Sequence, residues 1–255
     1  NFVEEAIRET GVTAPLMIMK GDGGVTSMDT FRTKPILTVL SGPAASVAGA
    51  LLYLKITNGI FVEVGGTSTN ICIIKNGKPE IRYVTIKNHP TCIRSMDVRV
   101  LGVAGGSMVQ VKSNTVVGVG PRSAHIAGLK YSCYAPIDDL STGEIIFVKP
   151  KPNDIEEYVA IKCKNETYAI TNTCAANALG RIPEGDYSYS DPATAKRALE
   201  ILGKKLGVTG TQAALSILQN ASFDITNEIT KIIKEFELEK SKVKLVGGGG
   251  GASVL

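Results

Sequence analysis

Residues 60–74 read IFVEVGGTSTNICII, and this stretch decides the fold. Its two apolar runs, Ile60–Val64 and Thr69–Ile74, predict short strands. Gly65 and Gly66 between them predict a tight turn, because glycine permits positive φ and close backbone approach. Backbone N–H groups in such a turn can converge on a phosphate.

The side chains beside this turn supply further phosphate and metal chemistry. Thr67, Ser68 and Thr69 carry hydroxyl donors, and Glu63 carries a carboxylate that can orient Mg²⁺ through water. Asn70 follows on the second strand and is a candidate catalytic residue together with Glu63. A plain Gly-Gly hairpin before a Thr-rich strand explains the same residues, so the motif alone leaves both interpretations open.

The segments flanking the turn predict a mixed α/β chain. After residue 74, Asn76-Gly77 predicts a second hairpin that leads to a strand over Glu80–Ile86, so three antiparallel strands would form a meander. Before residue 60, the patterns predict two helices and two strands, with Ser41 as a helix cap. These four elements cover Phe2–Thr10 (helix), Leu16–Met19 (strand), Pro35–Leu40 (strand) and Ser41–Leu54 (helix).

The second half of the chain is first strand-rich and then helical. Asp191-Pro192 predicts a helix start, and apolar residues spaced three or four apart from Ala214 to Phe236 predict one long amphipathic helix over Thr211–Phe236. Lys242–Val246 predicts a buried strand before the glycine loop Gly247–Gly251. The expected earlier strands are Val109–Val111, Thr115–Val117, Ile145–Val148, Tyr158–Cys163 and Tyr168–Thr171.

Composition narrows the class of protein. The 255 residues carry a net charge of +4 with no run of Lys or Arg, which argues against nucleic acid as a partner. No apolar run approaches the about 20 residues of a membrane span. The five cysteines are odd in number and widely spaced, so neither a zinc site nor a disulfide framework is expected, and a cytoplasmic location is the default.

The glycine loops form an ordered set that resembles a known family. The chain is similar to the hydantoinase/oxoprolinase A family of ATP-dependent cyclic-amide hydrolases, whose relatives include the acetone carboxylase β subunit. Five motifs carry the resemblance, in family order: Ser41-Gly42-Pro43-Ala44-Ala45, Gly65-Gly66-Thr67-Ser68-Thr69, Val103-Ala104-Gly105-Gly106-Ser107, Val119-Gly120-Pro121-Arg122-Ser123 and Leu179-Gly180-Arg181.

The resemblance implies a fold and a division of labour. It implies an α/β, ribonuclease-H-like domain of the actin, Hsp70 and sugar-kinase type. The chain opens inside a helical pattern and stops just after a glycine loop, so we interpret it as a fragment of a longer protein. Residues 1–255 would form one actin-like half, with residues 87–172 as a β-rich insertion. The N-terminal half of the nucleotide cleft would lie elsewhere, and this fragment alone would be inactive.

The resemblance also assigns ATP and Mg²⁺ as cofactors. Gly65 to Thr69 would hold phosphate together with Gly105 and Gly106, and Gly247, Gly248 and Gly249 would border adenosine. Glu63 would orient the metal. The expected substrate is a cyclic amide of the hydantoin or 5-oxoproline class, and a second hydrolase or carboxylase subunit or a further copy of the chain would be a partner.

Three departures from the family pattern bear on catalysis. Glu63 and Asn70 stand where the family usually has Asp, and Cys174 stands where it has Asp within a Thr-Asp-Ala-Asn motif. The alternatives are therefore a subunit of an ATP-dependent carboxylase, or a degenerate domain that binds nucleotide or a partner without turnover.

Two other residues admit either a functional or an ordinary role. Asp22, in the loop Gly21–Gly24, is a candidate catalytic residue that faces an active cleft, or an ordinary turn residue. His125 could be a general base or ligand, but a lone loop histidine is more often an ordinary surface or packed residue.

Overall fold

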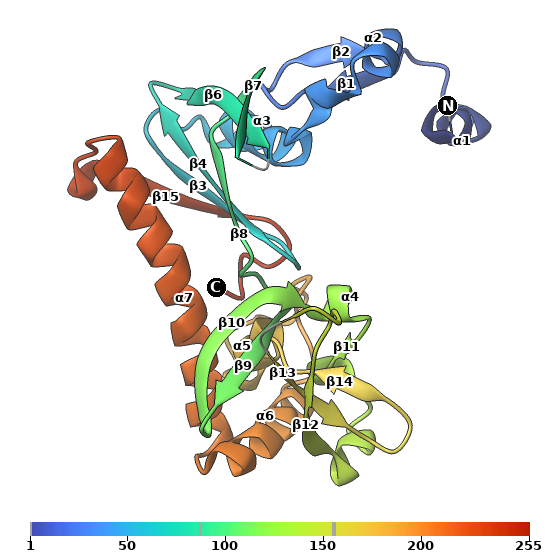
Figure 1. Ribbon diagram of the computed structural model, residues 1–255, viewed down its shortest axis with the longest axis vertical. Coiled ribbons are helices and arrows are strands. Elements are labelled where there is room, and N and C mark those ends of the chain that lie inside the picture. Colours follow the sequence, from blue (N-terminus) through green and yellow to red (C-terminus); the bar gives the residue numbers. More distant parts are fainter. Residues whose placement is uncertain (1, 87, 155–156) are drawn as a thin grey trace. The chain divides into compact units, whose positions relative to one another are not determined.

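The computed structural model describes residues 2–86, 88–154 and 157–255, which fold into two units. Unit 1 comprises residues 1–59 and 72–98, and unit 2 comprises residues 60–71 and 99–255. Figure 1 shows both, and each unit is described by itself below. Residue 87, where we place the start of the β-rich insertion, lies outside the described residues, and the insertion itself stays a prediction.

Unit 1 holds the N-terminal helices and two small β-structures. Its helices are α1 (Phe2–Glu9), α2 (Met28–Thr33) and α3 (Ser41–Leu54), with a 3₁₀ turn η1 (Pro35–Thr38) between the last two. Strands β1 (Met17–Met19) and β2 (Val25–Ser27) pair antiparallel around the loop at Gly21–Gly24. Strand β6 (Ile81–Ile86) pairs antiparallel with β7 (His89–Met96).

Several predictions for unit 1 are confirmed and three are wrong. The two helices and the strand at Met17–Met19 form as expected. Pro35–Leu40 is not a strand, because Pro35 starts the 3₁₀ turn instead. Ser41 is not the cap of α3, since Leu40 takes that position in the left-handed region with φ of 60°. The meander is also wrong, because β4 pairs with the short β5 (Lys78–Pro79) while β6 turns to β7.

Strands β3 (Gly59–Val64) and β4 (Thr69–Lys75) carry the glycine turn of residues 65–68. Both strands and the turn appear where the sequence predicts them. The predicted second hairpin also forms, with Asn76 and Gly77 at φ of 52° and 71°. Strand β15 (Lys244–Gly248) pairs with β3, so the C-terminal glycine run lies beside the turn of the central hairpin.

Unit 2 is built on a six-stranded sheet with the order β10-β9-β13-β14-β11 and with β12 also paired to β13. The expected strands of residues 109–171 all form, and Figure 1 shows them in green to yellow. Strand β8 (Val98–Leu101) precedes them. The six strands are β9 (Ser107–Lys112), β10 (Thr115–Ser123), β11 (Lys130–Tyr131), β12 (Glu144–Val148), β13 (Tyr158–Lys162) and β14 (Thr167–Ala169).

Three helices pack against this sheet. Helix α6 (Pro192–Leu206) begins where Asp191 accepts hydrogen bonds from the amides of Ala193 and Thr194, and it ends at Gly207. Helix α7 (Gly210–Glu235) opens with a capping box formed by Thr209 and Gln212. Helix α5 (Asn172–Ala178), which the sequence did not predict, is almost fully buried between them and the sheet.

One large hydrophobic cluster forms the main core of unit 2, and a smaller cluster lies around Met108 and Tyr158. The predicted stripe of α7 contributes Ala214 and Leu218 to the large cluster, and Ala221 is also buried. The C-terminal strand differs from the prediction, because β15 is largely exposed and Leu245 is 61% accessible. Short helical turns complete the unit at α4 (Ala124–Ala127), η2 (Ser132–Tyr134), η3 (Asp139–Thr142) and η4 (Lys240–Lys242).

No helix in the described part of the chain is long and apolar enough to cross a membrane.

Candidate functional site

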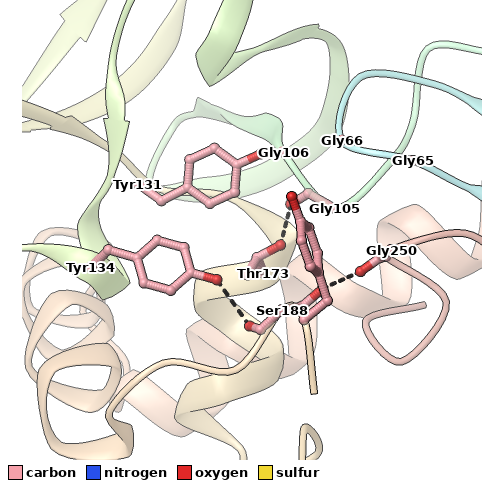
Figure 2. Close-up of a pocket in the computed structure, with 11 residues that line it drawn as sticks. Gly65, Gly66, Gly105, Gly106, Tyr131, Tyr134, Thr173, Ser188 and Gly250 are labelled. Carbon is pink, nitrogen blue, oxygen red and sulfur yellow. Dashed lines mark hydrogen bonds between the residues drawn. The ribbon is translucent and has the colours of Figure 1, made fainter. Parts of the chain in front are cut away.

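Three glycine loops of unit 2 meet around one pocket of about 490 Å³. The loops belong to the β3–β4 turn, to the segment before β9 and to the segment after β15. Figure 2 shows the pocket and the side chains that line it. Its lining consists of Gly65, Gly66, Gly105, Gly106, Tyr131, Tyr134, Thr173, Tyr187, Ser188, Gly250 and Gly251.

Backbone hydrogen bonds fix the three loops to one another. The amide of Gly105 donates to the carbonyl of Gly65 at 3.0 Å, and the amide of Gly106 donates to the carbonyl of Gly66 at 2.8 Å. The amide of Gly251 donates to the carbonyl of Val64 at 2.9 Å. Backbone from three separate stretches of sequence is therefore joined by hydrogen bonds into one pocket wall.

Only glycine fits at two of these positions. A Cβ on Gly106 would lie 2.1 Å from the hydroxyl of Tyr131 and 2.5 Å from the carbonyl oxygen of Gly66. A Cβ on Gly251 would lie 2.9 Å from the carbonyl oxygen of Gly65. The glycines are needed because strand-connecting backbones approach each other at these points.

The start of helix α5 closes one side of the pocket. Both the amide and the hydroxyl of Thr173 donate to the carbonyl of Gly105, each at 2.9 Å. The side-chain amide of Asn172 donates to the carbonyl of Ala104 at 2.8 Å. These contacts hold the second glycine loop on the buried helix.

A polar loop, residues 186–190, closes the opposite side. The hydroxyl of Ser188 donates to the carbonyl of Gly250, and the hydroxyl of Tyr134 donates to the carbonyl of Ser188 at 3.0 Å. Figure 2 shows both contacts as dashed lines. The side chain of Asn177 donates to the Ser188 carbonyl at 2.9 Å and accepts from the Ser190 amide at 2.8 Å. The loop is thus tied both to α5 and to the C-terminal glycine run.

The pocket lining carries no ionic side chain. Its polar groups are backbone amides and carbonyls, and the hydroxyls of tyrosine, threonine and serine. Burial raises the pKa of Tyr131 to about 12 and also raises the pKa of Tyr134, so both rings are neutral at physiological pH. The pocket is a neutral, donor-rich surface.

The sequence-predicted phosphate residues divide into two groups. Gly65, Gly66, Gly105 and Gly106 line the pocket together. Thr69 is fully buried, and its hydroxyl donates to the carbonyl of Val103 at 2.5 Å. The hydroxyl of Thr67 lies 3.4 Å from the hydroxyl of Ser123, the last residue of β10. The carbonyl of Ser68 accepts from the amide of Gly65 at 3.0 Å and so closes the turn.

The predicted adenosine loop lies beside the pocket, and its later glycines line the wall. Gly247, Gly248 and Gly249 are outside the lining, whereas Gly250 and Gly251 are part of it. Gly249 has a φ of 89°, which turns the chain out of β15 and toward the pocket. Residues 250–254 form turns.

Glu63 and Asn70 contact each other across the hairpin. The side-chain amide of Asn70 donates to the carboxylate of Glu63 at 2.8 Å, and neither residue lines the pocket. In the described ranges no cluster of three or more His, Cys, Asp or Glu side chains could hold a metal ion. The predicted roles of these two residues in catalysis and metal binding stay predictions.

Asp22 lies in unit 1, where it organises its own loop. Its carboxylate accepts from the amide of Gly24 at 2.9 Å and from the ammonium of Lys20 at 3.0 Å. Partial burial works against ionisation, but these two donors outweigh it and lower the pKa of Asp22. The contacts are those of a turn residue. His125 lies exposed in α4 and does not line the pocket.

The sequence did not single out four side chains of the pocket: Tyr131, Tyr134, Tyr187 and Ser188. Tyr131 precedes the 3₁₀ turn η2 and Tyr134 is its last residue, and their ring centroids lie 5.9 Å apart. The alternation of Ser and Tyr over residues 187–190 was the available signal for the other two.

Comparison with known proteins agrees with this fold. A family model described as hydantoinase/oxoprolinase matches residues 1–255, so the chain belongs to the hydantoinase/oxoprolinase family. Among curated proteins, it is 23% identical to caprolactamase subunit alpha of Pseudomonas jessenii over 261 residues, which are 99% of this chain and 33% of that subunit.

Two solved structures share the fold. The nucleotide-free structure of acetone carboxylase, from work on ATP-dependent acetone carboxylation, matches 99% of this chain and 32% of that chain, with a TM-score of 0.73 and 19% identity. The ATP-dependent caprolactamase from Pseudomonas jessenii matches 97% and 33%, with a TM-score of 0.59 and 21% identity. The expected α/β fold class is confirmed. This chain spans about a third of the length of each of these relatives.

Proposed function

We propose that this chain is the nucleotide-binding part of an ATP-dependent enzyme that hydrolyses cyclic amides. The observation that carries the proposal is the meeting of three glycine loops around one neutral pocket. Both solved relatives are described as ATP-dependent, and one of them acts on a caprolactam ring. The hydantoin or 5-oxoproline class is the substrate class that we assign.

The pocket fits the phosphates of a nucleotide. Among the residues that the structure describes, the amides of Gly66, Thr67 and Gly250 donate to no protein acceptor. Gly66 and Gly250 line the pocket, and both belong to glycine loops in which a ligand can approach the backbone closely. Unused amide donors in such a concave backbone are the usual means of binding an anion without a charged side chain.

The pocket does not by itself fit Mg²⁺. Its lining has no carboxylate, and the carboxylate of Glu63 is engaged by Asn70. Oxygen ligands from carboxylates are the usual protein contribution to a magnesium site. These residues alone would therefore not hold the metal ion.

The residues of this chain would act by holding and orienting. ATP would supply the phosphoryl group that activates the amide oxygen as a leaving group. The β3–β4 turn and the loop at Gly105 would fix the phosphates, while Ser188 and Thr173 keep the two walls of the pocket in place through Gly250 and Gly105. Catalysis of phosphoryl transfer rests largely on such positioning.

Calorimetry on the full-length protein tests the proposal. Titration with Mg-ATP should give a binding heat, and ATP hydrolysis should rise when hydantoin, 5-oxoproline or caprolactam is added. Absence of a binding heat would refute nucleotide binding. Binding without stimulation by any cyclic amide would refute the substrate class.

A carboxylase subunit is the second candidate, and the acetone carboxylase structure favours it with the higher TM-score of the two. Co-purification from the source organism decides between them. A stable partner subunit together with bicarbonate-dependent ATP hydrolysis would support the carboxylase.

A non-catalytic nucleotide-binding domain is the third candidate. Asn70 favours it, because its side-chain amide donates a hydrogen bond to the Glu63 carboxylate and so occupies an oxygen that a metal-bound water would need. Cys174 favours it too, because this residue lies fully buried beside the hydroxyl of Ser132 at 3.3 Å. Robust ATP turnover by the wild-type protein would exclude this candidate. Gain of ATPase activity on replacing both residues with Asp would support it.

A further inference from the structure

Tyr187 is an exposed aromatic ring on a fixed loop of the pocket. Its exposed fraction is 91%, the highest of the large apolar and aromatic side chains in the described ranges. A solvent-exposed ring on a mobile loop would be weak evidence for a ligand contact. Here the neighbours of Tyr187 on both sides are held.

The backbone on either side of Tyr187 is tied to other elements. The carboxylate of Asp186 accepts from the hydroxyl of Ser253 and from the amide of Ser188, both at 3.0 Å. The side chain of Ser188 is bonded to Gly250, and its carbonyl accepts from Tyr134 and Asn177. The loop is thereby preorganised, and the cost of ordering it on binding a ligand is small.

The ring lies against the glycine loop. A Cβ built on Gly250 would be 3.0 Å from Cδ1 and 3.3 Å from Cε1 of the Tyr187 ring. The ring therefore lies beside the Cα of Gly250, and a side chain at position 250 would press against the ring. Glycine at position 250 and an aromatic residue at position 187 form one unit of the wall.

The rest of this pocket matches a flat, uncharged group. No ionic side chain lines it, and Tyr131 and Tyr134 supply two further rings. Aromatic rings bind nucleobases through their faces, and each base–aromatic stack contributes about 1–3 kcal/mol, roughly five- to 150-fold in affinity.

We infer that Tyr187 is the base-stacking residue of the nucleotide site, with the adenine ring lying on its exposed face. The inference rests on the proposed function and adds a specificity-determining residue to it. The backbone amides would read the phosphates, whereas Tyr187 would read only the base. The two parts of the ligand can therefore be separated by experiment.

The test compares two ligands and four proteins by calorimetry on the full chain. The ligands are Mg-ATP and magnesium tripolyphosphate, which lacks the base and the sugar. The proteins are the wild type, Tyr187→Leu, Tyr187→Phe and Tyr83→Leu. Tyr83 is the matched control, since its ring is 62% exposed and is outside the pocket lining.

Tyr187→Leu should weaken ATP binding about five- to 150-fold and change tripolyphosphate binding less than twofold. Tyr187→Phe keeps the ring face and should bind ATP within about twofold of the wild type. Tyr83→Leu should match the wild type for both ligands. An unchanged melting temperature for Tyr187→Leu is expected from the exposure of the ring.

Three results would overturn the inference. ATP binding by Tyr187→Leu that equals the wild type would show that the ring does not stack on the base. An equal loss of both ligands would show that the ring only shapes the glycine loop. Wild-type protein that binds neither ligand would overturn the proposed function itself, which distinguishes that failure from the first two.

Discussion

The amide of Gly106 donates to the carbonyl of Gly66 at 2.8 Å, and the Tyr131 hydroxyl lies at the place where a side chain on residue 106 would have to be. One backbone contact thus joins two glycine loops that are 40 residues apart in the sequence. Its neighbour, from Gly105 to Gly65, makes the same connection at 3.0 Å. The glycine motifs are parts of a single surface.

Replacement of Gly106 by Ala should disrupt this surface. The new methyl group would overlap both the Tyr131 hydroxyl and the Gly66 carbonyl, so we expect a loss of about 1–3 kcal/mol in unfolding free energy and at least tenfold weaker ATP binding. Gly247→Ala is the control, because nothing lies within 4 Å of a Cβ at that position. Denaturant unfolding and calorimetry measure the two effects, and equal behaviour of the two variants would contradict the prediction.

Asn177 should be a stability determinant of the pocket. Its buried side chain donates to the carbonyls of Thr173 and Ser188 and accepts from the amide of Ser190. Asn177→Ala leaves buried groups without partners, and we expect a loss of about 2–3 kcal/mol in unfolding free energy.

The control for Asn177 is Asn220→Ala on α7. The side chain of Asn220 makes one local hydrogen bond, to the carbonyl of Ser216 at 2.9 Å, and is only partly buried. Its replacement should cost less than about 1 kcal/mol. A cost for Asn177→Ala as small as that of the control would show that the loop does not depend on this residue.

Asn70→Asp should destabilise the hairpin at neutral pH. The substitution replaces the donor that faces Glu63 at 2.8 Å with a second negative charge. We expect a lower melting temperature than wild type at pH 7 and a smaller difference below pH 5, where carboxylates take up protons. Asn70→Ser, which removes the amide without adding charge, is the comparison. A difference in melting temperature between Asn70→Asp and the wild type that is the same at both pH values would argue against this contact.

The cysteines should differ sharply in reactivity. Cys92 is exposed, whereas the other four are buried. Burial, followed by the charges of Asp97 and Glu80, raises the pKa of Cys72 to about 12, and burial raises the pKa of Cys133. Burial works against ionisation of Cys174, but hydrogen bonds outweigh it and lower the pKa of this thiol to about 6. Because this thiol is buried like the other three, iodoacetamide at pH 8 should reach and modify Cys92 alone in the folded protein. Peptide mass spectrometry identifies the modified residue, and early labelling of Cys72 would contradict the burial.

The sequence predicted local elements well where periodicity and end signals agreed. Helix α7 and the cap at Asp191 follow directly from apolar spacing and from the Asp-Pro pair. Leu40 was missed as the cap of α3, because a left-handed leucine has no sequence signal. The predicted strand at Pro35–Leu40 was also wrong, since an apolar run that starts with Pro is compatible with a 3₁₀ turn.

The candidate site was predictable only as far as its glycines. Glycine loops can be recognised in the sequence, but nothing in the sequence shows that Tyr131 fills the space left by Gly106. Tyr187 and Ser188 lie on a loop whose position depends on Asn177, a residue of the helix that the sequence did not reveal. Long-range hydrogen bonds of this kind become visible only in three dimensions.

Among the described residues, the pocket lining has no side chain that is charged at neutral pH. Its tyrosines Tyr131 and Tyr134 have pKa values raised by burial, so the lining keeps one protonation state from acid to mildly alkaline solution. These two tyrosines would then contribute nothing to a change in affinity with pH over that range, whereas the ligand would. For a nucleotide, the binding curve against pH would trace the ionisation of its own terminal phosphate.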